Sequence, residues 1–505
     1  MDAVVETRSG RVRGRPRRGV LAFLGIPYAR PAEGRLRFAA PEPPEPWAGV
    51  RDCFEPGPGA PQRSAMPKWL QGIAGNPKRY GLDCLCVNVI TPGLEARRRP
   101  VLVWIHGGGF VFGAGSAPVY DATQFAREHD VVVISLNYRL GALGFAQLDS
   151  VARGGPFASN VGLRDQLAAL AWVREHAAAF GGDPSNVTVF GESAGAMSIG
   201  ALLGSPLARG LFQRAICQSG AAHHVSSRDG AARMAHSLLR ALDLTSASAE
   251  RLCDVPLPAL IDAQLRASAS LPAPWGLLPW QPALDDDLLP APPLAAIAAG
   301  NARGISLLAG TNRDEYNLFL LNSAARAMDE ARLRHVIARV IGPARAEEAA
   351  ALYGELLPRS KPVERWSLLQ THRVFRAPAE RLAALAAQHT PETHAYCFTW
   401  SPPLTPRALG SCHALEIPLV FGSYRKPALR MLYATGGALS RAMQANWAAF
   451  AREGRPADAR WQQHAEGSAP FVLGPRDPRA QERFERARAF WAAQGHGPQE
   501  LGDVP

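Results

Sequence analysis

Apolar residues along the chain fall into two patterns that alternate from one end to the other. Short runs of β-branched and aromatic residues, bounded by glycine-containing turns, predict buried strands at residues 101–105, 187–190, 305–309 and 395–400. The segments between them are rich in alanine and leucine and predict helices. Such alternation is typical of an α/β protein with a large, mostly parallel central sheet flanked by helices.

A serine lies at one of the predicted strand-to-helix junctions. The pentapeptide at 191–195, Gly-Glu-Ser-Ala-Gly, directly follows the strand at 187–190. A sharp turn that exposes the Ser193 hydroxyl strains its backbone and leaves no room for side chains two residues to either side. Gly191 and Gly195 meet this requirement. A G-x-S-x-G pattern alone could recur by chance among 47 glycines, but its position here predicts a nucleophile elbow.

A second glycine-rich segment, His-Gly-Gly-Gly-Phe at 106–110, follows the predicted strand at 101–105. A loop without side chains lets backbone N–H groups point at a substrate carbonyl and stabilise the oxyanion formed during acyl transfer. We expect Gly108 and Gly109 to be donors, with the Ala194 N–H completing the oxyanion hole. Taken alone the segment would be interpreted as a plain turn, but together with the elbow it indicates catalysis.

These two motifs are similar to those of type-B carboxylesterases, the family that also contains cholinesterases and bacterial p-nitrobenzyl esterases. Further matching stretches run nearly end to end, at residues 23–29, 36–38, 160–166, 169–173 and 180–184. The resemblance implies an α/β-hydrolase fold in a single domain over residues 1–505. It also implies a serine esterase that needs no metal or organic cofactor.

A serine hydroxyl is a poor nucleophile at neutral pH and needs a histidine base and an acid that orients the histidine. In α/β-hydrolases the order along the chain is serine, acid, histidine. The strand at 305–309 ends in Gly-Thr-Asn-Arg-Asp-Glu, and the resemblance implies Glu315 as the acid and Asp314 as its structural neighbour. Tyr316 stands where a glycine commonly follows the acid, so the backbone conformation after Glu315 is not predicted.

One of the 13 histidines, His413, lies where a catalytic histidine is expected. It follows the strand at 395–400 and a proline-containing loop, so its ring could reach the elbow. The segment at 410–422 resembles the family's histidine motif, although Ala414 replaces a frequent glycine. The sequence therefore predicts Ser193 as nucleophile, His413 as base and Glu315 as acid.

Three other polar positions near these motifs invite weaker interpretations. Glu192 adjoins the nucleophile, but neighbours at a tight elbow point in different directions, so we expect it in a buried hydrogen-bonding network. Ser219 resembles a family serine near the acid, and a supporting or a plain structural role is equally open. The acidic run at 285–287, flanked by Pro282 and Pro290, predicts a solvated loop rather than a metal site.

The substrate pocket is less defined. Phe110 and Phe112 follow the oxyanion glycines and are expected to line the entrance or the acyl side. His223 and His224 follow the strand that leads to Ser219, where relatives shape the acyl pocket, yet exposed polar residues at a strand end would look the same. The choline-binding tryptophan that the resemblance implies is not evident, so choline esters are poor candidates.

Two insertions rich in alanine and leucine, at about 226–300 and 320–388, predict helices that cover the carboxyl edge of the sheet. They would form a lid over a deep, mostly apolar pocket. Residues 41–61 and 69–80 are expected to be surface loops near its rim.

The formal charge of +11 invites a nucleic-acid or anionic-membrane interpretation. The densest basic cluster consists of Arg11, Arg13, Arg15, Arg17 and Arg18. Glycines and a proline separate these arginines, which predicts an exposed hairpin tip, and no aromatic residue interleaves with them to stack on bases. We therefore expect no nucleic-acid partner.

No apolar run approaches the roughly 20 residues of a membrane span, and no signal peptide is evident near the start. Seven cysteines are an odd number. Secreted relatives carry a disulfide whose second cysteine matches Cys84, but the partner position holds Ala60, with Cys53 as the nearest substitute. We expect reduced cysteines and a cytoplasmic enzyme without a membrane partner.

The predicted activity is cleavage of small carboxylic esters through an acyl-enzyme intermediate. The same machinery attacks carbamates and amides, so such a hydrolase remains an alternative. A non-catalytic, cholinesterase-like binding module would typically lack a triad member, and here all three positions are filled. The physiological substrate and the oligomeric state do not follow from the sequence.

Overall fold

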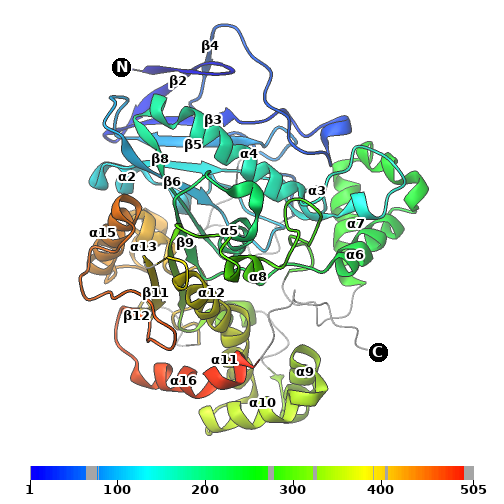
Figure 1. The fold of residues 1–505 in the computed structure, drawn as a ribbon, viewed down its shortest axis with the longest axis vertical. Coiled ribbons are helices and arrows are strands. Elements are labelled where there is room, and N and C mark those ends of the chain that lie inside the picture. Colours follow the sequence, from blue (N-terminus) through cyan, green and yellow to red (C-terminus); the bar gives the residue numbers. More distant parts are fainter. Residues whose placement is uncertain are drawn as a thin grey trace.

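The computed structural model describes residues 2–63, 77, 79–270, 278–321, 327–390, 392–403 and 408–493 (Figure 1). Most of the predicted loop at 69–80 lies outside the described residues. Residues 271–277 and 322–326 of the two predicted insertions lie outside them as well.

A twelve-stranded sheet forms the centre of the described molecule, in the order β1-β2-β3-β5-β7-β6-β8-β9-β10-β11-β12, with β4 paired to β2. The strands are β1 (Ala3–Thr7), β2 (Gly10–Arg17), β3 (Val20–Pro27), β4 (Val50–Asp52), β5 (Cys86–Thr91), β6 (Arg99–Ile105), β7 (Val132–Leu136), β8 (Gly182–Glu192), β9 (Arg214–Gln218), β10 (Ser306–Asn312), β11 (Thr393–Phe398) and β12 (Phe471–Leu473). From β7 to β12 every neighbouring pair is parallel. The prediction of a mostly parallel sheet is confirmed.

The helices flank this sheet. They are α2 (Thr123–His129), α3 (Gly141–Phe145), α4 (Val161–His176), α5 (Ala194–Gly204), α6 (Arg228–Ala241), α7 (Leu257–Ala269), α8 (Pro293–Ala298), α9 (Glu330–Ile341), α10 (Pro343–Leu356), α11 (Pro362–Thr371), α12 (Ala377–Ala387), α13 (Ile417–Phe421), α14 (Pro427–Arg430), α15 (Gly437–Glu453) and α16 (Pro478–Ala492). Two shorter helices matter for the site: the 3₁₀ helix η8 (Glu315–Leu320) and the π-helix η10 (His372–Arg376).

The register of the central strands brings their carboxyl ends together. Ile105 at the end of β6 pairs with Gly191 of β8, and Gln218 at the end of β9 pairs with Gly310 of β10. Loops that leave these strands therefore start at one edge of the sheet, which is where open α/β sheets bind their ligands.

Both predicted insertions contain helices. In Figure 1, α6 and α7 lie together on one side of the molecule, and α9 and α10 pair at one end of it. However, α12 packs against β10 and β11, and α8 packs against α5. Part of each insertion therefore belongs to the layers that flank the sheet, and a lid formed by the rest stays a prediction.

The structure corrects the prediction of an arginine-rich hairpin tip. Most of these arginines lie along β2, and only Arg18 occupies the turn, with a φ of 49°. Three of the strand arginines pair with acidic residues from later segments: Arg13 with Asp52 at 3.2 Å, Arg15 with Glu55 at 3.3 Å, and Arg17 with Asp121 at 2.9 Å. Such surface pairs add little stability, but they offset the local positive charge.

The acidic run at 285–287 is only partly the predicted solvated loop. Asp286 and Asp287 are exposed, whereas Asp285 is buried. The Asp285 carboxylate accepts hydrogen bonds from the Ser159 hydroxyl at 2.6 Å and the Asn160 amide at 2.7 Å. Its other oxygen accepts bonds from two backbone N–H groups. Asp285 therefore anchors its loop to the start of α4.

All seven cysteines lie within the described residues and none forms a disulfide, so Cys53 and Cys84 do not pair. No described helix has both the length and the hydropathy of a membrane span. Within the same part of the chain, no group of three or more histidine, cysteine or acidic side chains could hold a metal ion.

Candidate active site

Ser193 lies between β8 and α5 with φ 57° and ψ −127°, a backbone conformation that costs energy for any residue except glycine. The flanking glycines follow from the close approach of β6. A Cβ on Gly191 would lie 2.7 Å from the carbonyl oxygen of Ile105, and a Cβ on Gly195 would lie closer still to the same atom. Neither position has space for a side chain, as expected of an elbow that presents its serine.

The ring of His413 is held by Glu315, at the start of η8. Nδ1 of His413 lies 2.7 Å from Glu315 Oε2, and both side chains are buried. Glu315 Oε1 accepts a hydrogen bond from the Asn312 backbone at 2.7 Å, which fixes the carboxylate. The histidine and the acid, 98 residues apart in the sequence, therefore form one buried pair in which Nδ1 carries a proton.

A second carboxylate lies on the other side of the same ring. Nε2 of His413 is 3.1 Å from Glu192 Oε1, an ion-pair distance. Glu192 Oε1 has no hydrogen-bond partner among the described residues, so the contact with Nε2 is close but is not a hydrogen bond. Glu192 is buried, as the sequence predicted, but its neighbour is the histidine itself.

The nucleophile and Glu192 meet beside the oxyanion loop. A Cβ added to Gly107 would lie 3.0 Å from both Glu192 Oε2 and Ser193 Cβ. Because Glu192 also contacts His413, Ser193 adjoins a residue that contacts the pair of histidine and acid. Within the described residues the Ser193 hydroxyl makes no hydrogen bond, and it is therefore available to a reacting group.

The electrostatics of the site are dominated by buried glutamates. Burial alone would lower the pKa of His413, but the Glu192 and Glu315 carboxylates outweigh it and raise the pKa to about 9. Burial raises the pKa of Glu192 to about 8. The surroundings of His413 thus favour an imidazolium, the species that forms when a base takes a proton from serine.

A third buried glutamate, Glu416, was missed by the sequence reasoning. It accepts hydrogen bonds from the Asn312 side chain at 2.7 Å and the Gln218 side chain at 3.0 Å. Gln218 in turn accepts one from Trp447 at 3.0 Å. Burial, then Glu315, raises the pKa of Glu416. Its hydrogen-bond partners lie 104 and 198 residues away in the sequence, so no local signal marked it.

The predicted oxyanion loop is compact. Gly108 has a φ of 117°, and a Cβ there would overlap the carbonyl oxygen of Phe112. Ala194 is the first residue of α5, so its N–H has no acceptor within the helix. In the part of the chain that is described, the N–H groups of Gly108 and Gly109 donate to no protein acceptor. Three backbone donors therefore remain free for a ligand.

The remaining predicted residues lie in different surroundings. Ser219 is buried with a φ of 51°, and its hydroxyl has no hydrogen-bond partner among the described residues. Phe110 is fully buried against Phe145 in the core, so it supports the oxyanion loop from behind, whereas Phe112 is half-buried. Of the two phenylalanines, only Phe112 remains a proposal for the pocket.

His223 and His224 are not exposed polar residues, which corrects one of the two interpretations. His224 is buried, and both ring nitrogens of His223 are buried although the residue as a whole is only partly so. Their ring centroids are 3.8 Å apart. Burial is the main cause that lowers the pKa of both histidines, to about 3 for His224, so both are neutral near pH 7.

Two phenylalanines that the sequence reasoning missed flank the His413 ring. The centroid of Phe375, in η10, is 4.8 Å from that of His413, and the centroid of Phe319, in η8, is 5.2 Å from it. Both rings pack within contact range of the imidazole. Nothing in the local sequence distinguished them from ordinary core residues.

The two departures from the family pattern have different consequences. Tyr316 lies in η8 without a positive φ, and its N–H donates to the Thr371 hydroxyl at 3.1 Å, so no glycine is required there. Ala414 has a φ of 64°, in the left-handed region that favours glycine. The chain therefore keeps a strained alanine next to its histidine.

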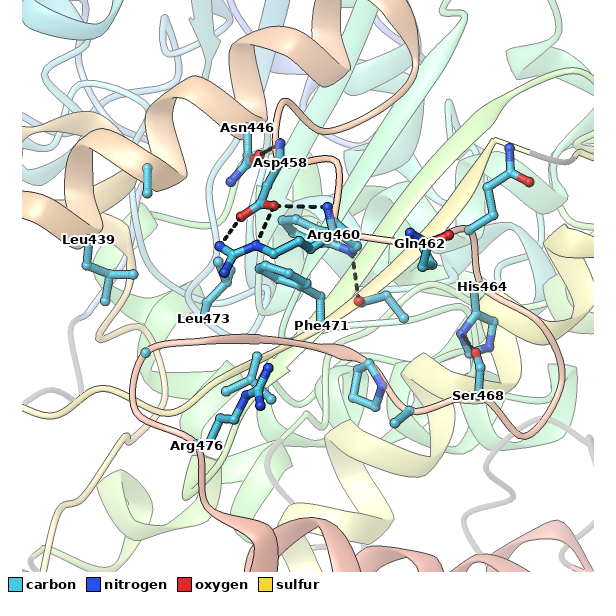
Figure 2. Close-up of a pocket in the computed structure, with 18 residues that line it drawn as sticks. Leu439, Asn446, Asp458, Arg460, Gln462, His464, Ser468, Phe471, Leu473 and Arg476 are labelled. Carbon is cyan, nitrogen blue, oxygen red and sulfur yellow. Dashed lines mark hydrogen bonds and ion pairs between the residues drawn. The ribbon is translucent and has the colours of Figure 1, made fainter.

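A separate cavity of about 660 Å³ lies between β12, α15 and the segment at 458–464, and contains none of the predicted site residues (Figure 2). Figure 2 shows the Asp458 carboxylate bonded to Arg460, at 2.6 Å. Trp461 and Phe471 stack at 4.7 Å. The charged groups therefore pair with each other and the aromatic rings stack, and the residues that line the cavity do not combine a serine, a histidine and an acid as the site above does.

Comparisons with known proteins identify the family and agree with the fold. The model of the carboxylesterase family matches residues 1–491. The chain is 41% identical to the para-nitrobenzyl esterase of Bacillus subtilis (strain 168), over 90% of each sequence. It is 34% identical to the phenmedipham hydrolase of Pseudarthrobacter oxydans, again over 90% of each. A solved structure of PNB esterase superposes with a TM-score of 0.85 at 38% identity, covering 96% of this chain and 99% of that one.

Proposed function

The chain belongs to the carboxylesterase family and is a carboxylic-ester hydrolase with an α/β-hydrolase fold, and we propose that Ser193, His413 and Glu315 are its catalytic triad. The observation that carries this proposal is the buried 2.7 Å contact between His413 and Glu315 beside a strained serine. We propose further that residues 1–505 form a single domain, with lid helices at about 226–300 and 320–388.

The geometry supports a two-step acyl transfer. Ser193 Oγ attacks the ester carbonyl while its proton passes to Nε2 of His413, and the resulting imidazolium is stabilised by Glu315 on Nδ1. Collapse of the tetrahedral intermediate expels the alcohol, which takes the proton from Nε2. Water then attacks the acyl-enzyme and gives a proton to the same nitrogen. Collapse of the second tetrahedral intermediate breaks the bond to Ser193 Oγ, which takes that proton back from Nε2 as the carboxylic acid leaves.

We assign the oxyanion hole to the N–H groups of Gly108, Gly109 and Ala194. All three are free of protein acceptors in the described structure, and Ala194 adds the positive end of the α5 dipole. Donors held in place before the reaction need no reorganisation as charge develops on the carbonyl oxygen.

We propose two supporting residues. Glu192 stabilises the imidazolium across the ring from Glu315, since its carboxylate lies 3.1 Å from Nε2. The hydroxyl of Ser219 has no partner in the described part of the chain, which leaves it free to hydrogen-bond the Glu315 carboxylate or a water beside it. Phe112 is our proposal for the pocket wall.

We propose that the enzyme works in the cytoplasm, because the chain has seven cysteines and no disulfide. We assign it no nucleic-acid or membrane partner. Carbamates and amides present the same type of carbonyl, so they stay alternative substrates, and phenmedipham belongs in the panel because one relative is a phenmedipham hydrolase.

The test is the substitution Ser193→Ala. We expect purified enzyme to cleave p-nitrophenyl esters of short to medium acids, and the variant to lose on the order of a million-fold in kcat. A fluorophosphonate should phosphonylate Ser193 with loss of HF, so the peptide that contains Ser193 should gain the mass of the reagent minus HF. The control is Ser150→Ala, which removes an exposed serine. Turnover by Ser193→Ala at the wild-type rate would falsify the assignment.

A further inference from the structure

Arg373 is a half-buried cation for which the described residues supply no anionic partner. It lies in η10, two residues before Phe375, whose ring contacts His413. Within the described residues Arg373 makes no hydrogen bond or ion pair, whereas Arg376 in the same helix pairs with Glu380 at 2.9 Å. Outside the described residues the only acidic side chains in the sequence are Glu500 and Asp503.

The surroundings of Arg373 include polar groups that lack hydrogen-bond partners among the described residues. Burial raises the pKa of Tyr316, and the charge of Arg373 opposes that rise. After burial, the same charge is among the causes that lower the pKa of His223 and His224. Both ring nitrogens of His223 and Nδ1 of His224 are buried without a hydrogen-bond partner among the described residues. His223 lies beside the Val374 backbone but makes no well-formed hydrogen bond to it.

The segments that carry this cluster adjoin the proposed catalytic residues. The histidines follow Gly220, where a Cβ would lie 2.6 Å from the carbonyl oxygen of Ser193. Tyr316 directly follows Glu315. Segments after β9 and within η10 thus place two neutral imidazoles and one guanidinium within four residues of groups that contact Ser193 or His413.

The unsatisfied ring nitrogens of His223 and His224 are costly to bury unless a ligand completes them, and the half-buried guanidinium of Arg373 lies free to pair with an anion. The chemistry of the cluster indicates which ligand. A guanidinium matches the two oxygens of a carboxylate, and each neutral imidazole can donate one further N–H. A neutral ester would leave the guanidinium without a counter-charge.

We propose that Arg373, with His223 and His224, forms a subsite for a carboxylate carried by the ester substrate. The preferred substrates are then anionic esters, either monoesters of dicarboxylic acids or esters of alcohols that bear a carboxylate. This inference rests on the proposed function, because it names the substrate class of the same catalytic site.

The kinetic test compares matched esters with one charge difference. For the acyl side the pair is mono-p-nitrophenyl adipate and p-nitrophenyl hexanoate; for the alcohol side it is 4-acetoxybenzoate and 4-methylphenyl acetate. We expect Arg373→Met to lower kcat/KM for the anionic member of one pair by roughly 10- to 100-fold, the range of a charge-assisted hydrogen bond. The neutral members should change by less than about threefold.

Two further variants separate a local subsite from general attraction of anions by a basic protein. Arg373→Lys keeps the charge and should restore part of the preference. Arg334→Met removes an exposed arginine of α9 and the same unit of charge, and should change neither member. Equal losses for the anionic and neutral members of both pairs, or no loss for either, would overturn the proposal.

Binding without turnover distinguishes this inference from the proposed function. Adipate should raise the Tm of Ser193→Ala but not of the double variant with Arg373→Met. If adipate binding depends on Arg373 but the wild-type enzyme cleaves no ester, the triad is refuted and the subsite is kept. If the enzyme cleaves esters but its adipate binding does not depend on Arg373, the subsite alone is refuted. If Arg373→Met does not fold, Arg373→Gln serves in the same comparisons.

Discussion

The contact between Glu192 and His413 makes a quantitative prediction for Glu192→Gln. The substitution keeps the size of the side chain and removes one negative charge 3.1 Å from Nε2. At an effective dielectric constant of about 20, two unit charges at that distance interact by roughly 5 kcal/mol. Burial raises the pKa of Glu192 to about 8, so the carboxyl group is largely protonated near pH 7 and the net effect is smaller.

The expected result is a shift of the acid limb of kcat/KM to lower pH by about 1 to 2 units, within the range that a neighbouring charge produces. The sign follows from the base. His413 must be neutral to accept the serine proton, its pKa is raised by the carboxylates, and activity falls as the pH drops below that pKa. Without Glu192 the imidazolium is less stable, so His413 stays neutral to lower pH. For the same reason the plateau value of kcat should fall, by about tenfold.

The assay is the pH dependence of p-nitrophenyl ester cleavage, followed at a wavelength where phenol and phenolate absorb equally. The control is Glu348→Gln, which removes an exposed glutamate of α10 and should leave the profile unchanged. Because the two groups titrate as a coupled pair, the apparent pKa of the limb is the quantity to compare. An acid limb of Glu192→Gln that stays in place or moves to higher pH would refute the electrostatic reasoning.

Three other substitutions test the scaffold. Gly108→Ala places a Cβ against the Phe112 carbonyl in a φ of 117° and should lower kcat by roughly 100- to 1000-fold with little change in the far-UV spectrum; near wild-type kcat would argue against Gly108 as a donor. Asp165→Asn leaves Arg139, which it binds at 2.6 and 2.8 Å, as a buried charge without a counter-ion, and should reduce the free energy of unfolding in urea by about 3 to 5 kcal/mol. A loss below about 1 kcal/mol would mean that water reaches the pair. Ala414→Gly relieves a left-handed alanine and should change the stability by between zero and about +1 kcal/mol, measured as a rise in Tm; a fall in Tm would show that the strain is absent.

The features that the sequence revealed are those set by local steric demands. Gly191 and Gly195 are required because β6 passes too close for side chains, and that requirement appears in the sequence as glycine at fixed spacing. The parallel strands could also be predicted, since a strand buried on both faces needs a continuous apolar run. Both signals depend on residues within a few positions of each other.

The features that the sequence concealed depend on partners far along the chain. Asp285 is buried because Ser159 and Asn160 reach it, more than 120 residues earlier in the sequence. The arginines of β2 were misplaced because strand β2 continues through proline and glycine, and their acidic partners come from other segments. In each case the decisive contact joins residues whose proximity no local pattern encodes.

The charges of the site act in opposite directions on the substrate and on the transition state. Carboxylates around His413 stabilise the imidazolium, but they also repel any anion that approaches the same crevice. A site with only these carboxylates would favour neutral or cationic esters. Arg373 lies on the same π-helix as Phe375, which packs on His413, and no carboxylate among the described residues neutralises it. The positive charge is therefore placed where it can offset the repulsion of an anionic substrate without cancelling the field at the histidine. Comparing anionic with neutral substrates separates repulsion of the substrate from stabilisation of the imidazolium.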